Sequence, residues 1–388
     1  MPIVNRVADL QPDIQAWRRD IHQHPELLYD VHRTAAFVAD RLREFGCDEV
    51  VTGLGRTGVV GVIEGKATGR GIGTIGLRAD MDALPIEEQT NLPYASKTSG
   101  KMHACGHDGH TAMLLGAARY LAETRNFAGR AVVIFQPAEE GGAGAAAMVK
   151  DGLMDRFGVE QVFGMHNGPG LPIGSFAIRQ GPIMASTDDV DIKIEGLGGH
   201  AARPHQCIDS VLVGAQLVTA LQSIVSRSID PLDSAVISIC EFNAGNTRNV
   251  IPQTAELKGT VRTLSPEVRA LTEKRVREVV AGVAQMTGAK IDLHYMNNYP
   301  VTNNHAAQTE IAKRIARQIA GDANVHESPP LMGGEDFAYM LQARPGAFIF
   351  CGNGDSAGLH HPAYDFNDEA IVYGASYWIK LVEDMLGA

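Results

Sequence analysis

Three histidines, a cysteine and an aspartate fall within eight residues of the chain, in the segment HACGHDGH (103–110). Cysteine thiolate and histidine nitrogen are good ligands for zinc and neighbouring divalent metals. The glycine between Cys105 and His107 lets the backbone turn so that both side chains face one ion. We therefore interpret Cys105 and His107 as metal ligands. Asp108 and His110 are better explained as helix-capping or solvated residues, because such residues are common where helices begin.

Two adjacent acids, Glu139 and Glu140, follow an apolar segment and precede a pair of glycines. Neighbouring side chains of an extended chain point to opposite sides, so the two carboxylates do not suit equivalent positions on one ion. A division of roles fits better: one carboxylate holds a metal, and the other takes a proton from the attacking water in metal-assisted hydrolysis. An exposed acidic turn is the alternative explanation of such a pair.

Two further histidines could complete a metal site. His166 ends an apolar segment, and His360 follows the segment GNGDSAG (352–358). Histidine is a common metal ligand, although each of these, taken alone, also fits a surface or a buried structural histidine. One thiolate, three imidazoles and one carboxylate are more than one tetrahedral zinc requires and suit two ions about 3.5–4 Å apart. The sequence thus predicts a dinuclear site.

Three residues in the middle of the chain could contact a substrate. His200 follows a predicted strand and two glycines, and Asn249 and Arg262 flank a later strand. The guanidinium of Arg262 is a bidentate fork suited to a carboxylate, whereas a solvated ion pair is the alternative. The acids of GGED (333–336) could line a cleft, but helix capping explains them better.

Around these residues the apolar spacing predicts alternating helices and strands. Helices are expected over 12–45, with a break at His24-Pro25 where proline disfavours helix, and over 109–125, 305–320 and 368–386. Strands are expected at 59–65, 74–80, 131–136, 161–167 and 347–352. Ligand sites of α/β proteins lie at the carboxyl ends of such strands, which is where Glu139, Glu140 and His166 fall.

The region 186–297 has a different pattern. Strands at 187–196, 234–243, 255–263 and 289–296 and helices at 208–228 and 266–286 give the order β-α-β-β-α-β of a ferredoxin-like unit. The predicted fold is therefore an α/β catalytic domain with a mixed central sheet, formed by residues 1–185 and 298–388. An inserted ferredoxin-like α+β satellite domain at 186–297 interrupts it.

Charge and composition exclude several functions. The 34 basic and 45 acidic residues give a net charge of −11, which is unsuited to nucleic acid or an anionic membrane surface. No apolar stretch approaches the roughly 18 residues of a membrane-spanning helix, and no signal peptide is recognisable, so a cytoplasmic location is expected. The five cysteines are scattered without a C-x-x-C pair; apart from Cys105, they are expected to be ordinary small apolar residues.

Nine ordered blocks resemble the hippurate hydrolase, aminoacylase and auxin-conjugate hydrolase branch of the metal-dependent aminoacylase and carboxypeptidase superfamily. They are RRDIHQHPEL (18–27), LRADMDALP (77–85), HACGHDGH (103–110), QPAEEGG (136–142), GMHN (164–167), GGHAARPH (198–205), NVIP (249–252), GGEDFAYM (333–340) and LHHPAYDFND (359–368). The resemblance covers nearly the whole chain.

This resemblance implies roles for individual residues. Two divalent ions per subunit, zinc, manganese, nickel or cobalt, would be bound by Cys105, His107, Glu140, His166 and His360, with Cys105 as a bridge. Glu139 would be the general base, and His200 would stabilise the oxyanion, often across a dimer interface formed by the satellite domain. Asn249 and Arg262 would hold the substrate carboxylate. The implied reaction is hydrolysis of the amide bond of an N-acyl amino acid, a small molecule, by a homodimer or higher homo-oligomer.

Three positions depart from the pattern of many relatives: Gly168 replaces a bulky ring, Arg203 a methionine and Val31 an acid. They leave the ligand set intact and the acyl group and amino acid open. The alternatives are a dipeptidase or carboxypeptidase of the same superfamily, a non-catalytic ligand-binding relative, and a thiol hydrolase that uses Cys105 with His107. The last predicts activity that survives a chelator.

Overall fold

The computed structural model describes residues 3–68 and 73–387. They form two compact units. Unit 1 contains the residues up to Ile183, Asn303–Pro329 and those from Asp336 onward, and unit 2 contains Met184–Thr302 and Pro330–Glu335. The chain passes from one unit to the other near β7 (Gly181–Met184) and β14 (Thr302–Asn304), and again on either side of Pro330–Glu335. Among the described residues, no helix is both long and apolar enough to cross a membrane.

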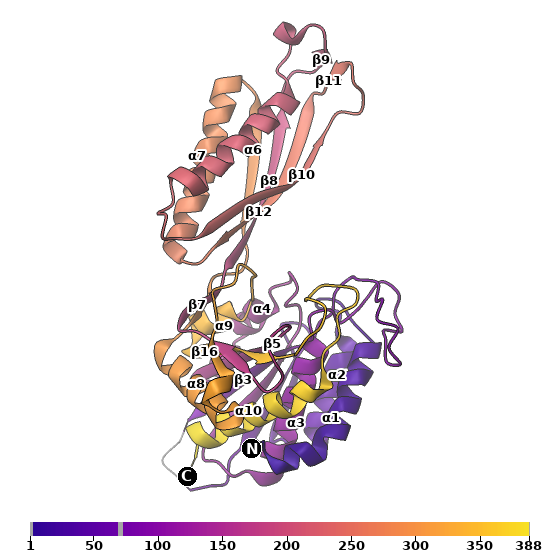
Figure 1. Cartoon of the computed structure of the whole chain (residues 1–388), viewed down its shortest axis with the longest axis vertical. Helices are drawn as coiled ribbons and strands as arrows, with labels where there is room; N and C mark the ends of the chain where they lie inside the picture. Colours follow the sequence, from indigo (N-terminus) through magenta and orange to yellow (C-terminus); the bar gives the residue numbers. More distant parts are fainter. Residues whose placement is uncertain (1–2, 69–72, 388) are drawn as a thin grey trace. The chain divides into compact units, whose positions relative to one another are not determined.

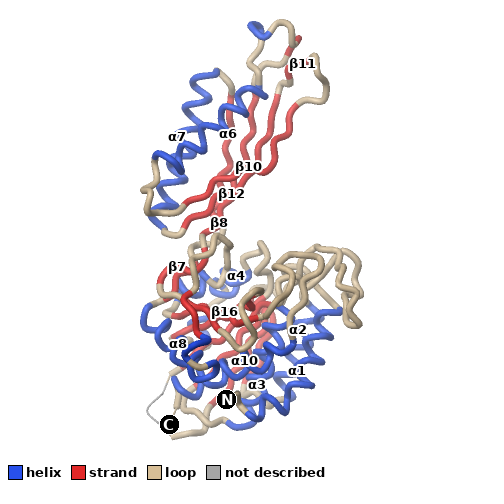
Figure 2. Tube along the Cα trace, viewed as in Figure 1, coloured by secondary structure: helices blue, strands red, loops and turns tan. Residues whose placement is uncertain are grey.

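Unit 1 is built on an eight-stranded mixed sheet with the order β1-β2-β4-β3-β5-β16-β6-β15. Figures 1 and 2 show helices beside the strands of this unit. The strands are β1 (Glu49–Leu54), β2 (Gly58–Glu64), β3 (Thr74–Asp80), β4 (Arg130–Gln136), β5 (Gln161–Gly168), β6 (Phe176–Ile178), β15 (Val325–Glu327) and β16 (Gly346–Gly352). β3 is parallel to β4 and β5, β5 is parallel to β16, and β2 is antiparallel to β4. The predicted α/β class with a mixed central sheet is confirmed.

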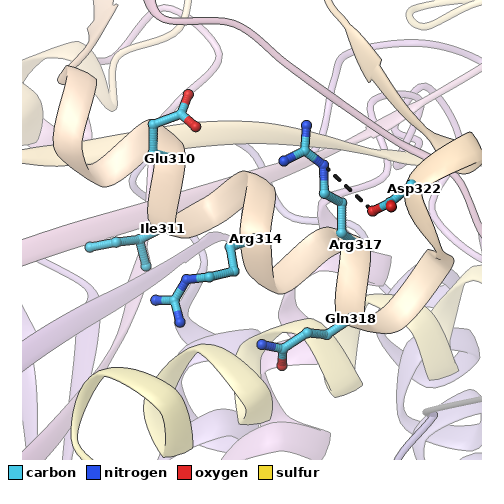
Figure 3. Close-up of a pocket in the computed structure, with 6 residues that line it drawn as sticks. All are labelled: Glu310, Ile311, Arg314, Arg317, Gln318 and Asp322. Carbon is cyan, nitrogen blue, oxygen red and sulfur yellow. Dashed lines mark ion pairs between the residues drawn. The ribbon is translucent and has the colours of Figure 1, made fainter.

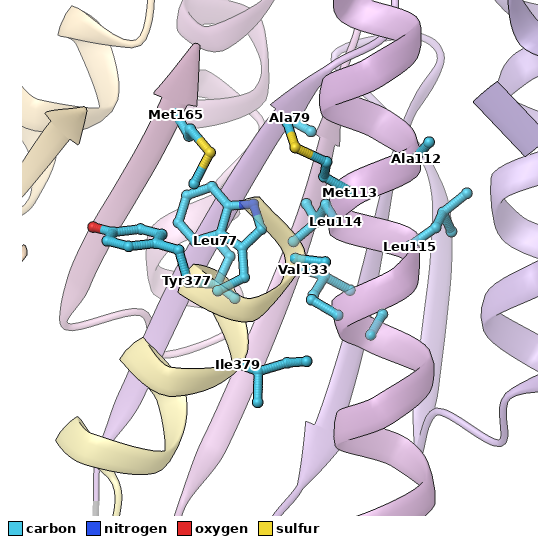
Figure 4. Close-up of a cluster of buried hydrophobic side chains, with 14 of the residues drawn as sticks. Leu77, Ala79, Ala112, Met113, Leu114, Leu115, Val133, Met165, Tyr377 and Ile379 are labelled. Carbon is cyan, nitrogen blue, oxygen red and sulfur yellow. The ribbon is translucent and has the colours of Figure 1, made fainter. Parts of the chain in front are cut away.

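Helices cover this sheet. They are α1 (Asn5–Gln23), α2 (His32–Glu44), α3 (His107–Thr124), α4 (Gly144–Lys150), α5 (Leu153–Arg156), α8 (Ala306–Ala320), α9 (Ala338–Ala343) and α10 (Ile371–Met385), with 3₁₀ turns at Asp322–Asn324 and Asp368–Ala370. α3 packs against β3, α1 and α10. Figure 4 shows Met113 and Leu114 of α3 and Tyr377 of α10 lying over Leu77 and Val133 of the sheet.

Burial explains these elements. Strands β3 and β4 are buried almost throughout because helices and neighbouring strands enclose them. The expected break at His24-Pro25 is present, since α1 ends at Gln23. The first helix nevertheless begins at Asn5 and contains Pro12, so the expectation of a start near residue 12 is wrong. The expected helix at 368–386 starts with a 3₁₀ turn, and its α-helical part begins at Ile371.

Unit 2 is a four-stranded antiparallel sheet of order β10-β12-β8-β13 with two helices that pack on it (Figure 1). The elements are β8 (Ser186–Glu195), α6 (Ser210–Arg227), β10 (Ala235–Ala244), β12 (Thr254–Thr263), α7 (Pro266–Thr287) and β13 (Lys290–Asn297). The predicted ferredoxin-like order is confirmed. A short pair, β9 (Gly199–His200) and β11 (Val250–Ile251), and a 3₁₀ turn at Pro204–Gln206 were not predicted.

Candidate metal centre

The five predicted ligands come from four segments near the ends of strands. Cys105 and His107 lie where α3 begins, and Glu140 follows the last residue of β4 by four positions. His166 lies two residues before the end of β5, and His360 lies in the loop that connects β16 to α10. Because β4, β3, β5 and β16 are neighbours in one sheet, their carboxyl ends bring these segments together.

Two of the groups of possible ligand atoms found among the described residues share one cysteine, and a further group joins Asp80 and His110 to His107. One cluster contains Cys105, His107 and His166, and the other contains Cys105, Glu140 and His360; within each, the ligand atoms lie within 4.8 Å of one another. The Sγ of Cys105 is 3.4 Å from Nε2 of His166, and Nε2 of His360 is 3.4 Å from Oε1 of Glu140. A thiolate shared by two such clusters is suited to bridging two ions.

Backbone carbonyls orient two of the imidazoles. Nδ1 of His107 lies 2.8 Å from the carbonyl oxygen of Asp82, and Nδ1 of His166 lies 2.7 Å from that of Asn167. A carbonyl only accepts, so each Nδ1 donates. In the neutral ring Nε2 then carries the lone pair that a metal requires. Both rings are buried, which restricts them to this orientation.

The buried polar atoms of the site fit divalent metals. Nε2 of His107 is buried without a hydrogen-bond partner and lies 3.9 Å from Oε1 of Glu140, which is itself 3.4 Å from Nε2 of His360. A buried polar group without a partner is costly, and a metal ion would give Nε2 of His107 one. The donors, one sulfur, three nitrogens and one carboxylate, suit zinc and its neighbours in the first transition row. The residues present therefore fit two divalent ions.

The charges around the centre change the proton affinities of the ligands. Burial raises the pKa of the Cys105 thiol well above its usual value, and the carboxylates of Glu140 and Glu139 raise it further. Burial lowers the pKa of His107, but Asp80, Asp82 and Glu140 more than reverse this and raise it to about 10. The pKa of His166 is lowered well below its usual value, chiefly by burial. Without metal, Cys105 and His107 therefore hold protons at neutral pH.

We expect metal binding to release about two protons at pH 7. The thiol of Cys105 and the imidazolium of His107 must each lose a proton before they can bind a metal. The apparent affinity should then rise about 100-fold per pH unit near neutrality and fall as the pH falls. Calorimetric titration with Zn²⁺ in two buffers of different ionisation enthalpy measures the proton count. Heats that do not depend on the buffer would contradict the expectation.

Asp82 holds the backbone of the two glutamates. The backbone N–H groups of Glu139 and Glu140 donate to its two carboxylate oxygens, at 2.9 and 3.1 Å. The turn before them is tight, since Ala138 has a positive φ of 56°. Glu139 is buried, and its carboxylate lies within 4.8 Å of ligand atoms of His107 and Glu140. A carboxylate at this distance can accept a proton from a water molecule held beside the cluster.

The expectation that Asp108 and His110 cap the helix or face solvent is wrong. Both side chains are buried, and α3 has no side-chain cap. The Asp108 carboxylate lies 2.8 Å from Nδ1 of His22 and 3.5 Å from Nη1 of Arg18. His110 contacts the carboxylate of Asp80 at 2.6 Å. Asp80 is the last residue of β3, so the sequence indicates a carboxylate at that strand end, but it does not indicate the partner His110, which lies far along the chain.

Helix capping is also the wrong explanation for Asp336, because α9 has no side-chain cap. Its carboxylate accepts from Nη2 of Arg78 at 3.2 Å, from Nε2 of Gln136 and from the backbone N–H of Ala145 at 2.9 Å. Arg78 also donates to Asp80 at 2.7 Å. This buried network joins the ends of β3 and β4 to the start of α4.

Within unit 2, the three candidate substrate residues lie in two places. His200 is in β9, the carbonyl of Asn249 accepts from the backbone of Ala201 at 3.1 Å, and both side chains are exposed. Arg262 is near the other end of β12, where it pairs with Thr187. The chain continues to β9 from the opposite end of β8, where Glu195 pairs with Thr254. Thr254 lies eight positions before Arg262 in β12, which corresponds to roughly 26 Å of strand.

A surface hollow of about 580 Å³ lies along α8 in unit 1. Figure 3 shows its lining of charged side chains, with Arg317 paired to Asp322 at 3.8 Å. It contains none of the predicted ligands and has no metal-binding or catalytic arrangement, so the clustered ligands in unit 1 remain the candidate site.

An α/β unit with clustered sulfur, nitrogen and carboxylate ligands at its strand ends is suited to metal-assisted hydrolysis, and the comparison with known proteins identifies the class as metal-dependent amidohydrolases. The chain matches the model of peptidase family M20/M25/M40 over residues 76–384, and it belongs to that family.

The chain is also similar to individual proteins with related activities or folds. The chain is 44% identical to hippurate hydrolase of Campylobacter jejuni over 385 residues, 98% of each chain. It is 41% identical to N-acetyl-L-cysteine deacetylase of Bacillus subtilis, over 96% of this chain and 88% of that protein. The crystal structure of the Bacillus subtilis YXEP protein, described as a dinuclear metal binding peptidase from the M20 family, matches with a TM-score of 0.84 and 36% identity. It covers 98% of this chain and 99% of that chain.

Proposed function

We propose that this enzyme hydrolyses the amide bond of N-acyl amino acids with two divalent ions held by Cys105, His107, Glu140, His166 and His360. The observation that carries the proposal is the sharing of Cys105 by two ligand clusters with the Glu139 carboxylate beside them. The similarity to hippurate hydrolase and to N-acetyl-L-cysteine deacetylase supports an acyl amino acid as substrate.

The residues of the chain divide the reaction between them. Bound divalent ions supply Lewis acidity, which lowers the pKa of water and polarises the amide carbonyl. Glu139 takes the proton from the attacking water and returns it to the leaving nitrogen. His200 donates a hydrogen bond to the oxygen that becomes negative. Arg262 pairs with the substrate carboxylate, which the net negative charge of the protein would not attract.

Peptide hydrolysis is the second candidate, because the structurally similar YXEP protein is described as a peptidase. Both reactions attack an amide next to an amino acid, and they differ in whether an acyl group or a free amine lies on the other side. The specificity would therefore depend on the pocket for the acyl group, which we infer is widened by Gly168 in place of the bulky ring of many relatives.

A chelator-controlled hydrolysis panel tests the proposal. N-acetyl, N-benzoyl and indole-acetyl amino acids and unblocked dipeptides are compared after metal removal and after restoring Mn²⁺, Zn²⁺, Ni²⁺ or Co²⁺ singly. Cleavage of acyl amino acids that disappears with chelator and returns with metal is expected. Cleavage of dipeptides alone would favour the second candidate, and chelator-resistant cleavage would favour thiol chemistry. Inactivity of the metal-loaded protein on the whole panel would favour a binding protein.

We also propose that unit 2 forms a homodimer. β10 is an edge strand of its sheet and is largely exposed, with Phe242 40% exposed on it. An exposed edge of this length is a template for pairing with another chain. His200 and Arg262 are far apart within one copy. We therefore assign His200 and Asn249 of each subunit to the active site of the partner subunit, and Arg262 to the active site of its own subunit.

A cytoplasmic location stays a prediction from the sequence.

Mixing two inactive variants tests this assignment. His200→Ala is expected to lower turnover about 100-fold, as for loss of one oxyanion donor. When His200→Ala subunits are mixed and reassociated with Glu139→Gln subunits, half the dimers become mixed, and one site in each has both residues intact. Activity should then recover to about a quarter of the parent value. No recovery, with mixed dimers shown by native mass spectrometry, would place His200 in the site of its own chain.

A further inference from the structure

We propose that Asp80, His110 and Asn167 are positioning residues, which fix the imidazole of His166 and the backbone at Cys105 for metal binding. The inference rests on the proposed function. None of the three belongs to the proposed ligand set or to the proposed catalytic residues. All three side chains are buried in unit 1, and together they connect the segments that carry the ligands.

The first connection is a chain of hydrogen bonds that begins at Asp80. Its Oδ1 lies 2.6 Å from Nδ1 of His110, and Nε2 of His110 lies 2.9 Å from the backbone nitrogen of Asn167. The backbone N–H of Asn167 can only donate a hydrogen bond, so Nε2 of His110 accepts it. Nδ1 of His110 then carries the hydrogen and donates to Asp80. The carboxylate thus selects the one tautomer of His110 that can hold the Asn167 backbone.

That backbone in turn orients a proposed ligand. The carbonyl of Asn167 accepts from Nδ1 of His166 at 2.7 Å, which leaves Nε2 of His166 facing Cys105. The rings of His110 and His166 also pack edge to face, with centroids 4.5 Å apart and an interplanar angle of 66°. His110 therefore restricts His166 in two ways, by holding the residue that accepts its hydrogen bond and by contacting its ring.

The side chain of Asn167 makes the second connection. Its Nδ2 donates to the carbonyl of Cys105 at 2.6 Å, and its Oδ1 accepts from the hydroxyl of Tyr364 at 2.8 Å. Tyr364 is buried four residues after His360. The approach is close enough that a Cβ on Gly106, where φ is +89°, would lie 2.3 Å from Nδ2. One amide group thereby ties the Cys105 turn to the segment that carries His360.

Partners that orient a ligand typically contribute 10–100-fold to metal affinity. Loss of the His110 contacts would free the His166 ring and the Asn167 backbone together while leaving all five ligands present. The expected signature is weaker binding with altered metal geometry rather than loss of the donors. Hydrolysis rates alone would not separate this effect from others, so the test uses metal binding.

The test compares His110→Phe, which keeps a planar ring without nitrogens, with His110→Gln, whose amide can still accept from Asn167. His305→Phe is the matched control, because His305 also hydrogen-bonds backbone groups, those of Gly346, but lies at the start of α8. Each full-length variant is titrated with Co²⁺ by calorimetry, and the absorption bands of the bound ion are recorded. Circular dichroism checks the fold of each variant.

We expect His110→Phe to bind Co²⁺ about 10–100-fold more weakly, with shifted absorption bands. His110→Gln should lie closer to the parent, and His305→Phe should match it. Parent-like affinity and bands in His110→Phe would overturn the positioning role. If His110→Phe does not fold, Tyr364→Phe, which removes one hydroxyl, decides: weaker binding supports the role, and unchanged binding overturns it. A parent protein that binds no Co²⁺ would overturn the proposed function as well.

Discussion

Replacing Glu139 with glutamine is expected to lower kcat by about 10³-fold, within the range that general acid–base groups contribute. Glutamine has nearly the same shape as glutamate, but its amide cannot take a proton from water at neutral pH. Metal content should be unchanged, because Glu139 belongs to neither of the two clusters that share Cys105. Steady-state kinetics on the best acyl amino acid, with metal content measured on the same samples, checks the expectation.

Glu140→Gln is the matched control, because it makes the same change one residue later. Glu140 lies in the cluster with Cys105 and His360, so this variant should lose metal and activity together, whereas Glu139→Gln should lose activity alone. Near-normal turnover of metal-loaded Glu139→Gln would remove Glu139 as the base. Loss of metal in both variants would show that the two carboxylates do not divide the roles as proposed.

Cys105→Ser is expected to weaken binding of both ions, since Cys105 belongs to both ligand clusters. A serine hydroxyl stays protonated at neutral pH and is a harder, poorer ligand than thiolate. Because loss of an orienting partner alone costs about 10–100-fold in affinity, loss of a shared ligand should cost more than about 100-fold. Elemental analysis after dialysis and calorimetric titration with Zn²⁺ and Mn²⁺ measure the loss.

Cys351→Ser makes the same exchange at another buried cysteine, in β16 and outside both clusters. It should keep both metals even if burying a hydroxyl lowers its stability. A Cys105→Ser protein with parent-like metal content would exclude Cys105 as a ligand. The same variant tests thiol catalysis, which the buried thiol with its raised pKa disfavours: restoring activity to Cys105→Ser with excess metal would exclude a cysteine nucleophile.

The secondary structure of unit 2 could be predicted from the sequence nearly residue by residue. Strands β8, β12 and β13 alternate more and less buried positions over much of their length, and the helices carry one apolar face, so local spacing specifies them. Short elements such as β9 and β11 could not be predicted, because two-residue strands have no period and exist only through each other. The start of α1 at Asn5 could not be predicted, because Pro12 is the eighth residue of the helix, where a proline removes the hydrogen bond to the carbonyl of Ala8 and is unfavourable.

For the site, the sequence by itself determined the chemical types of the ligands. Soft and borderline donors at short spacing, with a glycine between Cys105 and His107, already indicate a divalent metal. Only the tertiary structure decided that His110 holds Asn167 instead of facing water. The reason is geometric: ligand-bearing segments far apart in the chain meet where neighbouring strands of one sheet end, and sequence spacing does not encode which atoms then face each other.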